Sequence, residues 1–188
     1  MKTYLAIVTA LLFATDIFSQ VNLAGVNVAG SMKMSDKVLA LNGAGIRKKL
    51  FIEVYVGSLY TTTKTSNGEA LAKADEPQVM RIHITSGMVT SDKMADATKE
   101  GFEKSTGGNT APIKDKIEKF VALFKREAIT KGNVFDLAYV PGSGVSASKN
   151  GKLLETIPGL DFKTALFSMW VGANPVDDGL KTGLLGTK

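Results

Sequence analysis

Three stretches of the chain carry the apolar and polar pattern of β-strands. Residues 50–60 are rich in aliphatic and aromatic side chains, residues 79–85 alternate strictly, and residues 134–140 form a third run. Successive side chains of a strand point to opposite faces, so this alternation indicates strands that are buried on one side. Two further runs, 145–149 and 152–157, are separated by Asn150-Gly151, a pair that favours a two-residue hairpin turn.

Apolar residues at helical spacing predict helices between and after these strands. One apolar face predicts a helix from about Pro112 to Glu127, and the pattern recurs from Phe162 to Trp170. A weaker amphipathic pattern covers Ser91 to Lys104. Asn174 followed by Pro175 predicts the N-cap of a short terminal helix. The apolar positions expected to face the core are Ile113, Ile117, Phe120, Val121 and Phe124 in the first helix and Phe162, Ala165, Leu166, Met169 and Trp170 in the second.

The order of these elements predicts an α+β fold. Strands come first, helices follow in the middle, and a hairpin precedes the last helices, which is not the regular alternation of a parallel α/β sheet. The pattern instead favours a large, mostly antiparallel sheet with a layer of helices on one face, an open-faced sandwich. No repeat or linker divides the chain, so residues 21–188 are predicted to form one domain.

Residues 1–20 have the layout of a secretory signal peptide. One lysine precedes an apolar run from Tyr4 to Phe13, and the segment then becomes polar up to Gln20. The run of about ten apolar residues is well short of the roughly 20 that cross a bilayer, and no comparable run follows, so no transmembrane segment is expected in the mature chain. The protein is therefore expected to be exported, to the periplasm or outside the cell.

Composition narrows the classes of function. The net charge of +5 comes from basic residues spread along the chain, and with 7% aromatic residues they give no sign of a nucleic-acid surface. With no cysteine, disulfides and thiolate metal sites are excluded. The single histidine, His83, cannot build a His-based metal site, and its place in an alternating run favours a solvent-facing or edge position. No metal and no cofactor is therefore expected.

Short motifs that resemble catalytic or nucleotide-binding signatures have simpler explanations. Gly43-Ala44-Gly45 lacks the third glycine of a dinucleotide fingerprint and leads into a strand rather than a helix. Gly142-Ser143-Gly144 lacks the spacing of a nucleophile elbow. Asp177 and Asp178 fall at a predicted helix start, where the helix dipole favours acidic residues. We therefore expect no catalytic residue among them.

Two segments resemble the chalcone isomerase superfamily. The first is Gly43-Ala44-Gly45-Ile46-Arg47, leading into a strand that contains Tyr55 and Tyr60. The second is Ile157-Pro158-Gly159 followed by 162–172 and Pro175, which resembles the bacterial chalcone isomerase-like branch. The resemblance covers the mature chain and implies an open-faced sandwich with a ligand cleft between sheet and helices.

The same resemblance implies a ligand-binding role for Arg47 and Tyr55. In the fatty-acid-binding members the motif arginine and the first tyrosine of the strand motif hold the carboxylate. A guanidinium grips a carboxylate with two parallel hydrogen bonds, and a tyrosine adds a hydroxyl donor. The two residues are eight apart, roughly 26 Å along a straight strand, so a bend or hairpin must lie between them. From the residues alone, Arg47-Lys48-Lys49 equally fits a solvated turn, and Tyr60 fits core packing.

The resemblance also bears on catalysis. True chalcone isomerases carry a tyrosine and an asparagine at the places of Thr90 and Ala97, and losing those polar groups removes transition-state stabilisation. We therefore interpret the sequence as an exported, non-catalytic protein that binds a fatty acid or a similar amphiphilic carboxylate. The alternatives are an isomerase of the intramolecular lyase type acting on a chalcone- or enone-like substrate, and an interaction module without a ligand.

Overall fold

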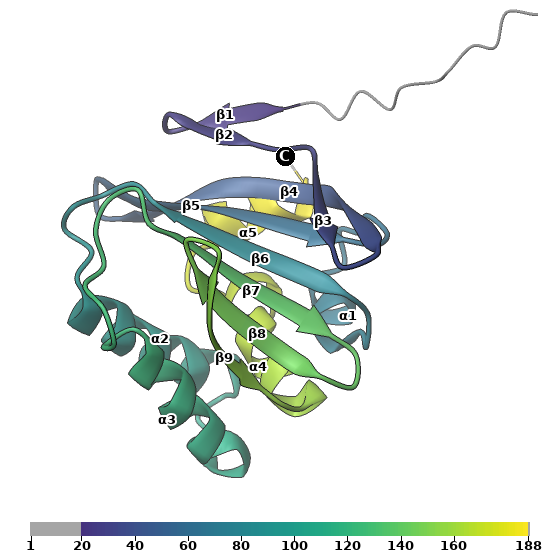
Figure 1. Cartoon of the computed structure of the whole chain (residues 1–188), viewed down its shortest axis with the longest axis vertical. Helices are drawn as coiled ribbons and strands as arrows, with labels where there is room; N and C mark the ends of the chain where they lie inside the picture. The colour runs from purple at the N-terminus through teal and green to yellow at the C-terminus, as the bar shows by residue number, and fades with distance from the viewer. Residues whose placement is uncertain (1–19, 188) are drawn as a thin grey trace, which may run out of the picture.

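Seven consecutive strands form one antiparallel sheet that curls beside a layer of helices (Figure 1). The computed structural model describes residues 20–187, so the expected signal peptide lies outside the described part except for Gln20. From the second strand of this sheet onward, each strand pairs with the strand that precedes it in the chain. The strands are β3 (Ser31–Met34), β4 (Lys37–Lys49), β5 (Ile52–Thr61), β6 (Gln78–Ile84), β7 (Val134–Val140), β8 (Gly144–Lys149) and β9 (Lys152–Ile157), after a separate hairpin of β1 (Val21–Leu23) and β2 (Val26–Val28).

The helices lie on one face of this sheet. Their buried residues share one core with Tyr55, Met80 and Leu137, whereas the small cluster on the other face, around Leu39 and Tyr60, contains no helical residue. The helices are α1 (Gly68–Lys73), α2 (Ser91–Ser105), α3 (Lys114–Leu123), α4 (Leu160–Val171) and α5 (Asp178–Leu185), with a short 3-10 turn η1 (Ala111–Ile113). The predicted α+β open-faced sandwich is confirmed.

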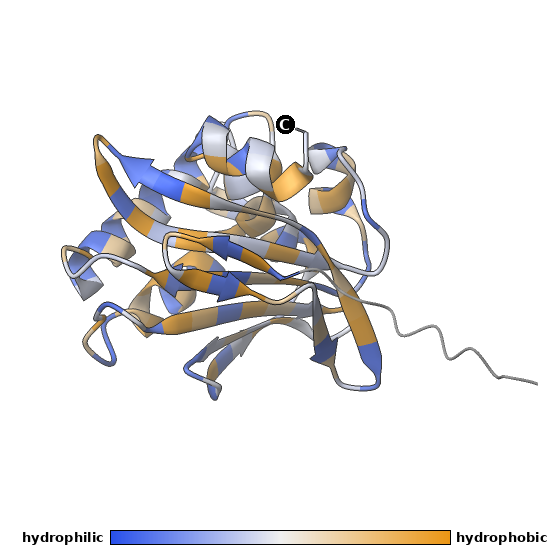
Figure 2. Cartoon of the chain, turned by 90° about the horizontal axis from the view of Figure 1, so that it is seen from above, coloured by the Kyte–Doolittle hydropathy of each residue, from blue (hydrophilic) through white to orange (hydrophobic). Residues whose placement is uncertain are grey.

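Strand alternation determines which side chains enter the core. On β6, Met80, Ile82 and Ile84 are buried, and the intervening His83 is half-buried on the other face. Figure 2 shows the resulting alternation of apolar and polar bands along the strands. Phe102, Phe120 and Phe162 join three helices in one aromatic cluster, with ring centroids 5.5 to 6.2 Å apart. The helical positions expected to face the core are all buried.

Two predicted helix boundaries are wrong. The helix expected at 112–127 is helical as α3 only over 114–123, because the chain turns away after Phe124. The terminal helix does not start at Pro175. Its N-cap is Asp177, whose Oδ1 accepts a hydrogen bond from the backbone N–H of Leu180 at 2.7 Å. The Asp177 carboxylate also accepts a hydrogen bond from the backbone N–H of Lys48 at 3.2 Å, so a tertiary contact adds to the cap at this position.

The turn between β4 and β5 is also displaced from the prediction. Residues 50–60 were expected to form one strand, but Leu50 and Phe51 make the two-residue connection between paired Lys49 and Ile52. Leu50 has a positive φ of 57°, a conformation that glycine or asparagine adopts more easily in such turns. The sequence therefore carries no ordinary turn signal here. At Asn150-Gly151, by contrast, the usual signal is present and the predicted hairpin of β8 and β9 is confirmed.

Helix α5 lies unusually close to β4. A methyl group on Gly43 would overlap the backbone carbonyl oxygen of Gly183 and would lie 2.5 Å from that of Leu184. A methyl group on Gly183 would in turn lie 2.6 Å from the carbonyl oxygen of Ala44. The Gly43-Ala44-Gly45 segment is thus explained by helix-to-strand packing, because only residues without a Cβ atom permit this approach.

A buried lysine joins α4 to the end of α1. Lys163 Nζ donates hydrogen bonds to the carbonyl oxygens of Leu71, Ala72 and Ala74 at 2.9, 3.0 and 2.7 Å. Its side chain is completely buried, and burial lowers its pKa to about 8, even though the charge of nearby Asp75 acts in the opposite direction. At neutral pH the ammonium is charged, and its hydrogen bonds satisfy the free carbonyl groups at the C-terminal end of α1.

This lysine should make stability depend on pH. The folded-state pKa of about 8 lies below the value of about 10.5 for an unfolded lysine, so in this window the unfolded chain binds more protons. The free energy of unfolding should therefore rise between pH 8 and 9.5, by up to about 1.4 kcal/mol per pH unit. Urea denaturation of wild type and Lys163→Met at each pH isolates this contribution. If the free energy of unfolding changed with pH equally in the two proteins, the three carbonyls would be keeping the pKa of Lys163 at its ordinary value.

Candidate functional site

The β4–β5 hairpin brings Arg47 and Tyr55 together. They are cross-strand partners in the sheet, and the guanidinium carbon of Arg47 lies 5.5 Å from the centre of the Tyr55 ring. The bend that their spacing requires is the connection at Leu50 and Phe51. A β-bulge lies next to this pair, between Arg47 and Lys48. It places one extra residue in β5, so the pairing register is shifted by one residue from there to the turn.

Tyr55 is held from the helical side by Trp170. The indole Nε1 of Trp170, on α4, donates a hydrogen bond of 2.8 Å to the Tyr55 hydroxyl oxygen. Because the hydroxyl accepts this bond, its own proton stays available for a further acceptor. Burial raises the pKa of Tyr55 above its ordinary value near 10, so the group is a neutral donor at physiological pH.

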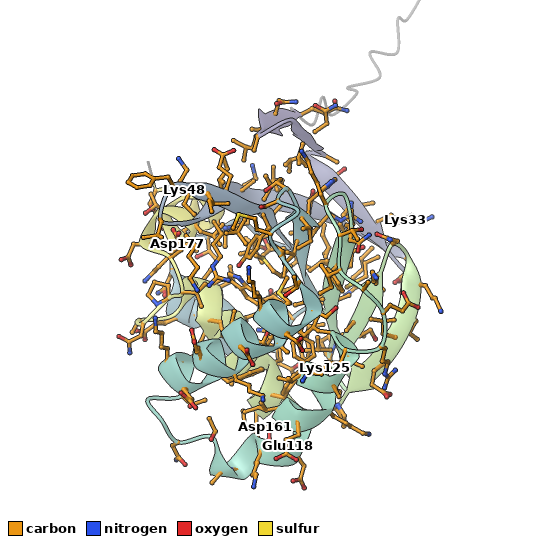
Figure 3. All side chains as sticks on the ribbon, turned by 90° about the vertical axis from the view of Figure 1, so that its left-hand side faces the viewer. Lys33, Lys48, Glu118, Lys125, Asp161 and Asp177 are labelled. Carbon is orange, nitrogen blue, oxygen red and sulfur yellow. The ribbon has the colours of Figure 1, made fainter. Side chains whose placement is uncertain are left out.

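Arg47 is half-buried and carries its charge without a carboxylate partner. Within residues 20–187, no Asp or Glu oxygen lies within 4.0 Å of its guanidinium nitrogens, and the polar side chain beside it is the hydroxyl of Tyr55. The nearby carboxylate of Asp177 is already bonded to the backbone N–H groups of Leu180 and Lys48. Figure 3 shows Asp177 and Lys48 next to each other on one side of the molecule. The guanidinium has five N–H donors and no carboxylate partner among the described residues, so it keeps donors available for an anion.

Arg47 and Tyr55 line a groove of about 450 Å³ between the hairpin and α2. Ligand pockets commonly measure about 300–1,000 Å³, so the groove has the volume of a small-molecule site. Its walls are mostly apolar, and charged side chains occupy the rim. The apolar lining is Leu50, Ile52, Val54, Met88, Val89, Met94 and Ala97, and the charged lining besides Arg47 is Lys49, Lys93, Asp96 and Glu100.

A second, much smaller cavity lies deeper, behind the same two residues. It measures about 20 Å³ and is lined by core side chains of the sheet and of α2, α3 and α4, among them Met94, Met169 and Trp170. A water molecule needs roughly 10–15 Å³ of such space, so this cavity has room for about one water. Any ligand larger than water therefore has room in the outer groove and not in the interior.

The three consecutive basic residues have different environments. Arg47 faces the groove, and Lys49 lies at its rim, while Lys48 is exposed on the opposite face of the strand. The interpretation of the whole triplet as a solvated turn is therefore too simple. Tyr60 lies on the other face of the sheet, where its hydroxyl donates to the carbonyl of Ala29 at 3.0 Å, as core packing predicts.

The positions that match the polar groups of chalcone isomerases have other surroundings. Thr90 is the N-cap of α2, and its hydroxyl accepts a hydrogen bond from the backbone N–H of Lys93 at 3.3 Å. Ala97 presents only a methyl group to the wall of the groove. Within residues 20–187, no group of three or more metal-ligating side chains comes together. Inside its charged rim, the groove thus offers two adjacent hydrogen-bond donors, Arg47 and Tyr55, beside an apolar wall.

Sequence reasoning missed Trp170 and the α2 rim as parts of this site. Trp170 was assigned to the core, and its bond to Tyr55 joins residues 115 positions apart. It is the only tryptophan in the chain, and a buried indole N–H needs an acceptor. The need of this N–H group for an acceptor was the signal in the sequence that could have indicated a polar contact at Trp170.

The fold and the site define an open-faced sandwich with an apolar groove between its sheet and its helical layer. The model of the family described as chalcone isomerase-like matches residues 20–186, so the chain belongs to this family. Among curated proteins there is no match. The fold is similar to the crystal structure of a fatty-acid binding protein from Arabidopsis thaliana, with a TM-score of 0.71 at 19% identity, covering 90% of this chain and 97% of the other. In the described part of the chain, every helix is too short or too polar to cross a membrane.

Proposed function

We propose that this protein binds a fatty acid or a similar amphiphilic carboxylate, with Arg47 and Tyr55 holding the carboxylate. The observation that carries the proposal is an unpaired guanidinium and a neutral hydroxyl donor, adjacent in one hairpin, at the wall of an apolar groove. The likeness in fold to a plant fatty-acid binding protein adds support. Export, expected from residues 1–20, belongs to the same proposal.

The acyl chain would lie along the outer groove. Besides Arg47, the groove is lined by Ile52, Val54, Met88 and Met94, and its volume of about 450 Å³ suits a single chain. Burial of apolar surface would stabilise the tail, at roughly 25 cal/mol per Å². The charged head would gain charge-assisted hydrogen bonds in a half-buried place, where they are stronger than in water. The carboxylate head group and the acyl chain would thus contribute separately to the binding affinity.

Comparing an acid with its alcohol tests the head-group part of this proposal. Trp170 bonds directly to Tyr55 and is the only tryptophan, so its fluorescence should report occupancy. We expect dodecanoate to bind at least about tenfold more tightly than dodecanol, since the alcohol loses the charge-assisted bonds. Ala97→Phe, which fills the groove wall, should weaken both ligands, and Lys99→Phe on the exposed side of α2 should weaken neither. Equal affinity for acid and alcohol would argue against a carboxylate anchor.

A further inference from the structure

The β4–β5 turn exposes large apolar side chains at the rim of the groove. Leu50 is 86% exposed and Phe51 is 99% exposed, although both are residues that normally enter a core. Across the groove Met88, in the loop before α2, is 56% exposed. We refer to Leu50, Phe51 and Met88 as the apolar tip. Exposed apolar residues that gather at one place indicate an interaction surface.

The turn keeps this geometry against local preference. Leu50 has a φ of 57°, where asparagine or glycine would be less strained, and neither Leu50 nor Phe51 is buried by the fold. Folding therefore gives no reason for apolar residues at these two positions. Places where a sequence breaks a local rule without structural compensation are candidates for function.

Charges of both signs surround the apolar tip, and the basic ones gather on the hairpin side. Lys48 and Lys49 precede Leu50 directly, and Lys93 lies across the groove, where its Nζ donates to the carbonyl of Met88 at 3.1 Å. The acidic residues nearby are Glu53, two residues beyond Phe51, the α2 residues Asp96 and Glu100 on the facing wall, and Asp177, whose carboxylate accepts from the backbone N–H of Lys48 at 3.2 Å. The hairpin side of the rim is thus basic, and the protein as a whole has a net charge of +5.

We propose that the apolar tip, with Lys48 and Lys49, docks the protein onto an anionic lipid bilayer. A narrow turn with protruding leucine and phenylalanine side chains suits shallow insertion between head groups, and lysines beside it suit their negative charge. A protein partner would be expected to meet a broader apolar face than two residues of a turn. Docking in this orientation would bring the open groove to the membrane surface. The docking itself needs no bound ligand, so it is separate from the proposed carboxylate binding.

Co-sedimentation with vesicles tests the docking. We expect the full chain to bind vesicles of phosphatidylcholine and phosphatidylglycerol at a 7:3 ratio more tightly than pure phosphatidylcholine, with affinity falling as salt rises. Lys48→Gln with Lys49→Gln should weaken binding to the anionic vesicles by about fivefold per lysine. Leu50→Asn with Phe51→Ser should weaken it by at least about fivefold, because the inserted apolar surface is lost.

The other end of β4 provides matched controls. Val38 is 60% exposed near the start of β4, and Lys33 on neighbouring β3 lies on the opposite side of the molecule from Lys48 (Figure 3). Val38→Ser with Lys33→Gln should leave vesicle binding unchanged. The apolar residues 4–13 are present in every variant, so differences between variants report the apolar tip. Lys48 does not line the groove, so Lys48→Gln alone should weaken vesicle binding and leave dodecanoate binding normal, which separates this result from the test of carboxylate binding.

Three outcomes would overturn the docking proposal. The first is wild-type protein that ignores anionic vesicles, and the second is a Leu50 and Phe51 variant that binds them as well as wild type does. The third is a change of oligomeric state: if sedimentation velocity finds a wild-type dimer that Phe51→Ser converts to a monomer, the apolar tip is an interface between copies of this chain.

Discussion

Replacing Arg47 with alanine should weaken the binding of dodecanoate about 10- to 100-fold, the loss expected when hydrogen bonds from a charged donor to a carboxylate are removed. In the structure Arg47 has no carboxylate partner among the described residues, so the substitution breaks no internal ion pair. The effect should therefore fall on ligand affinity and leave the fold intact. Fluorescence of Trp170 gives the affinity, and mass spectrometry of gently purified protein gives the amount of co-purified lipid.

Two further variants separate charge from geometry. Arg47→Lys keeps the positive charge but loses the two parallel donors, so its affinity should lie between those of wild type and Arg47→Ala. Arg126→Ala removes an arginine that is engaged elsewhere, with Glu155 at 3.3 Å and the carbonyl of Leu154 at 2.8 Å, and should bind dodecanoate normally. If Arg47→Ala retained the wild-type affinity and the wild-type lipid load, Arg47 would not be the anchor.

Substituting Gly43 with alanine should lower the free energy of unfolding by about 2–3 kcal/mol, at the upper end of the usual range for overpacking. The added methyl group would overlap the backbone of α5 at Gly183 and Leu184, and backbone atoms have no alternative rotamer. Relief would require α5 to move away from β4, with loss of the bonds between the Asn42 side chain and the carbonyl of Leu184 and between Asp177 and Lys48. Urea denaturation monitored by circular dichroism measures the change.

Gly87 provides the matched control for this substitution. It lies in an exposed loop, no atom lies within 4 Å of the place that an added methyl group would take, and its φ is not in the left-handed region. Gly87→Ala should leave stability within about 0.5 kcal/mol of wild type or raise it slightly, because alanine restricts the unfolded chain. Similar stabilities for the Gly43 and Gly87 variants would mean that α5 adapts easily and that its close approach contributes little.

Much of the fold could be predicted from the sequence because it depends on local patterns of residues. The alternation over 79–85 and the Asn150-Gly151 turn depend on neighbours in the chain, and both were predicted correctly. Helix ends were predicted less well, since they depend on tertiary contacts. Asp177 starts α5 where its carboxylate can also accept from the backbone of Lys48, 129 residues away, and no local pattern reveals that contact.

The candidate site was predictable only in part. The resemblance to the chalcone isomerase family singled out Arg47 and Tyr55, and their spacing implied a bend between them. The turn itself was missed because Leu50 and Phe51 resemble strand residues rather than turn residues. The volume and lining of the groove depend on how α2 lies against the hairpin, which the sequence does not encode locally. The partnership of Trp170 with Tyr55 was missed for the same reason.

The way α5 covers β4 also has a consequence for the newly made chain. Strands β4 to β9 each pair with the strand synthesised immediately before, so the sheet can grow as the chain leaves the ribosome. The glycine face of β4 is different, because its cover is the eight-residue helix at positions 178–185. This strand, which carries Arg47, is covered only when the chain has emerged as far as residue 185. The glycine face of β4 therefore stays uncovered for nearly the whole time that translation of the domain takes.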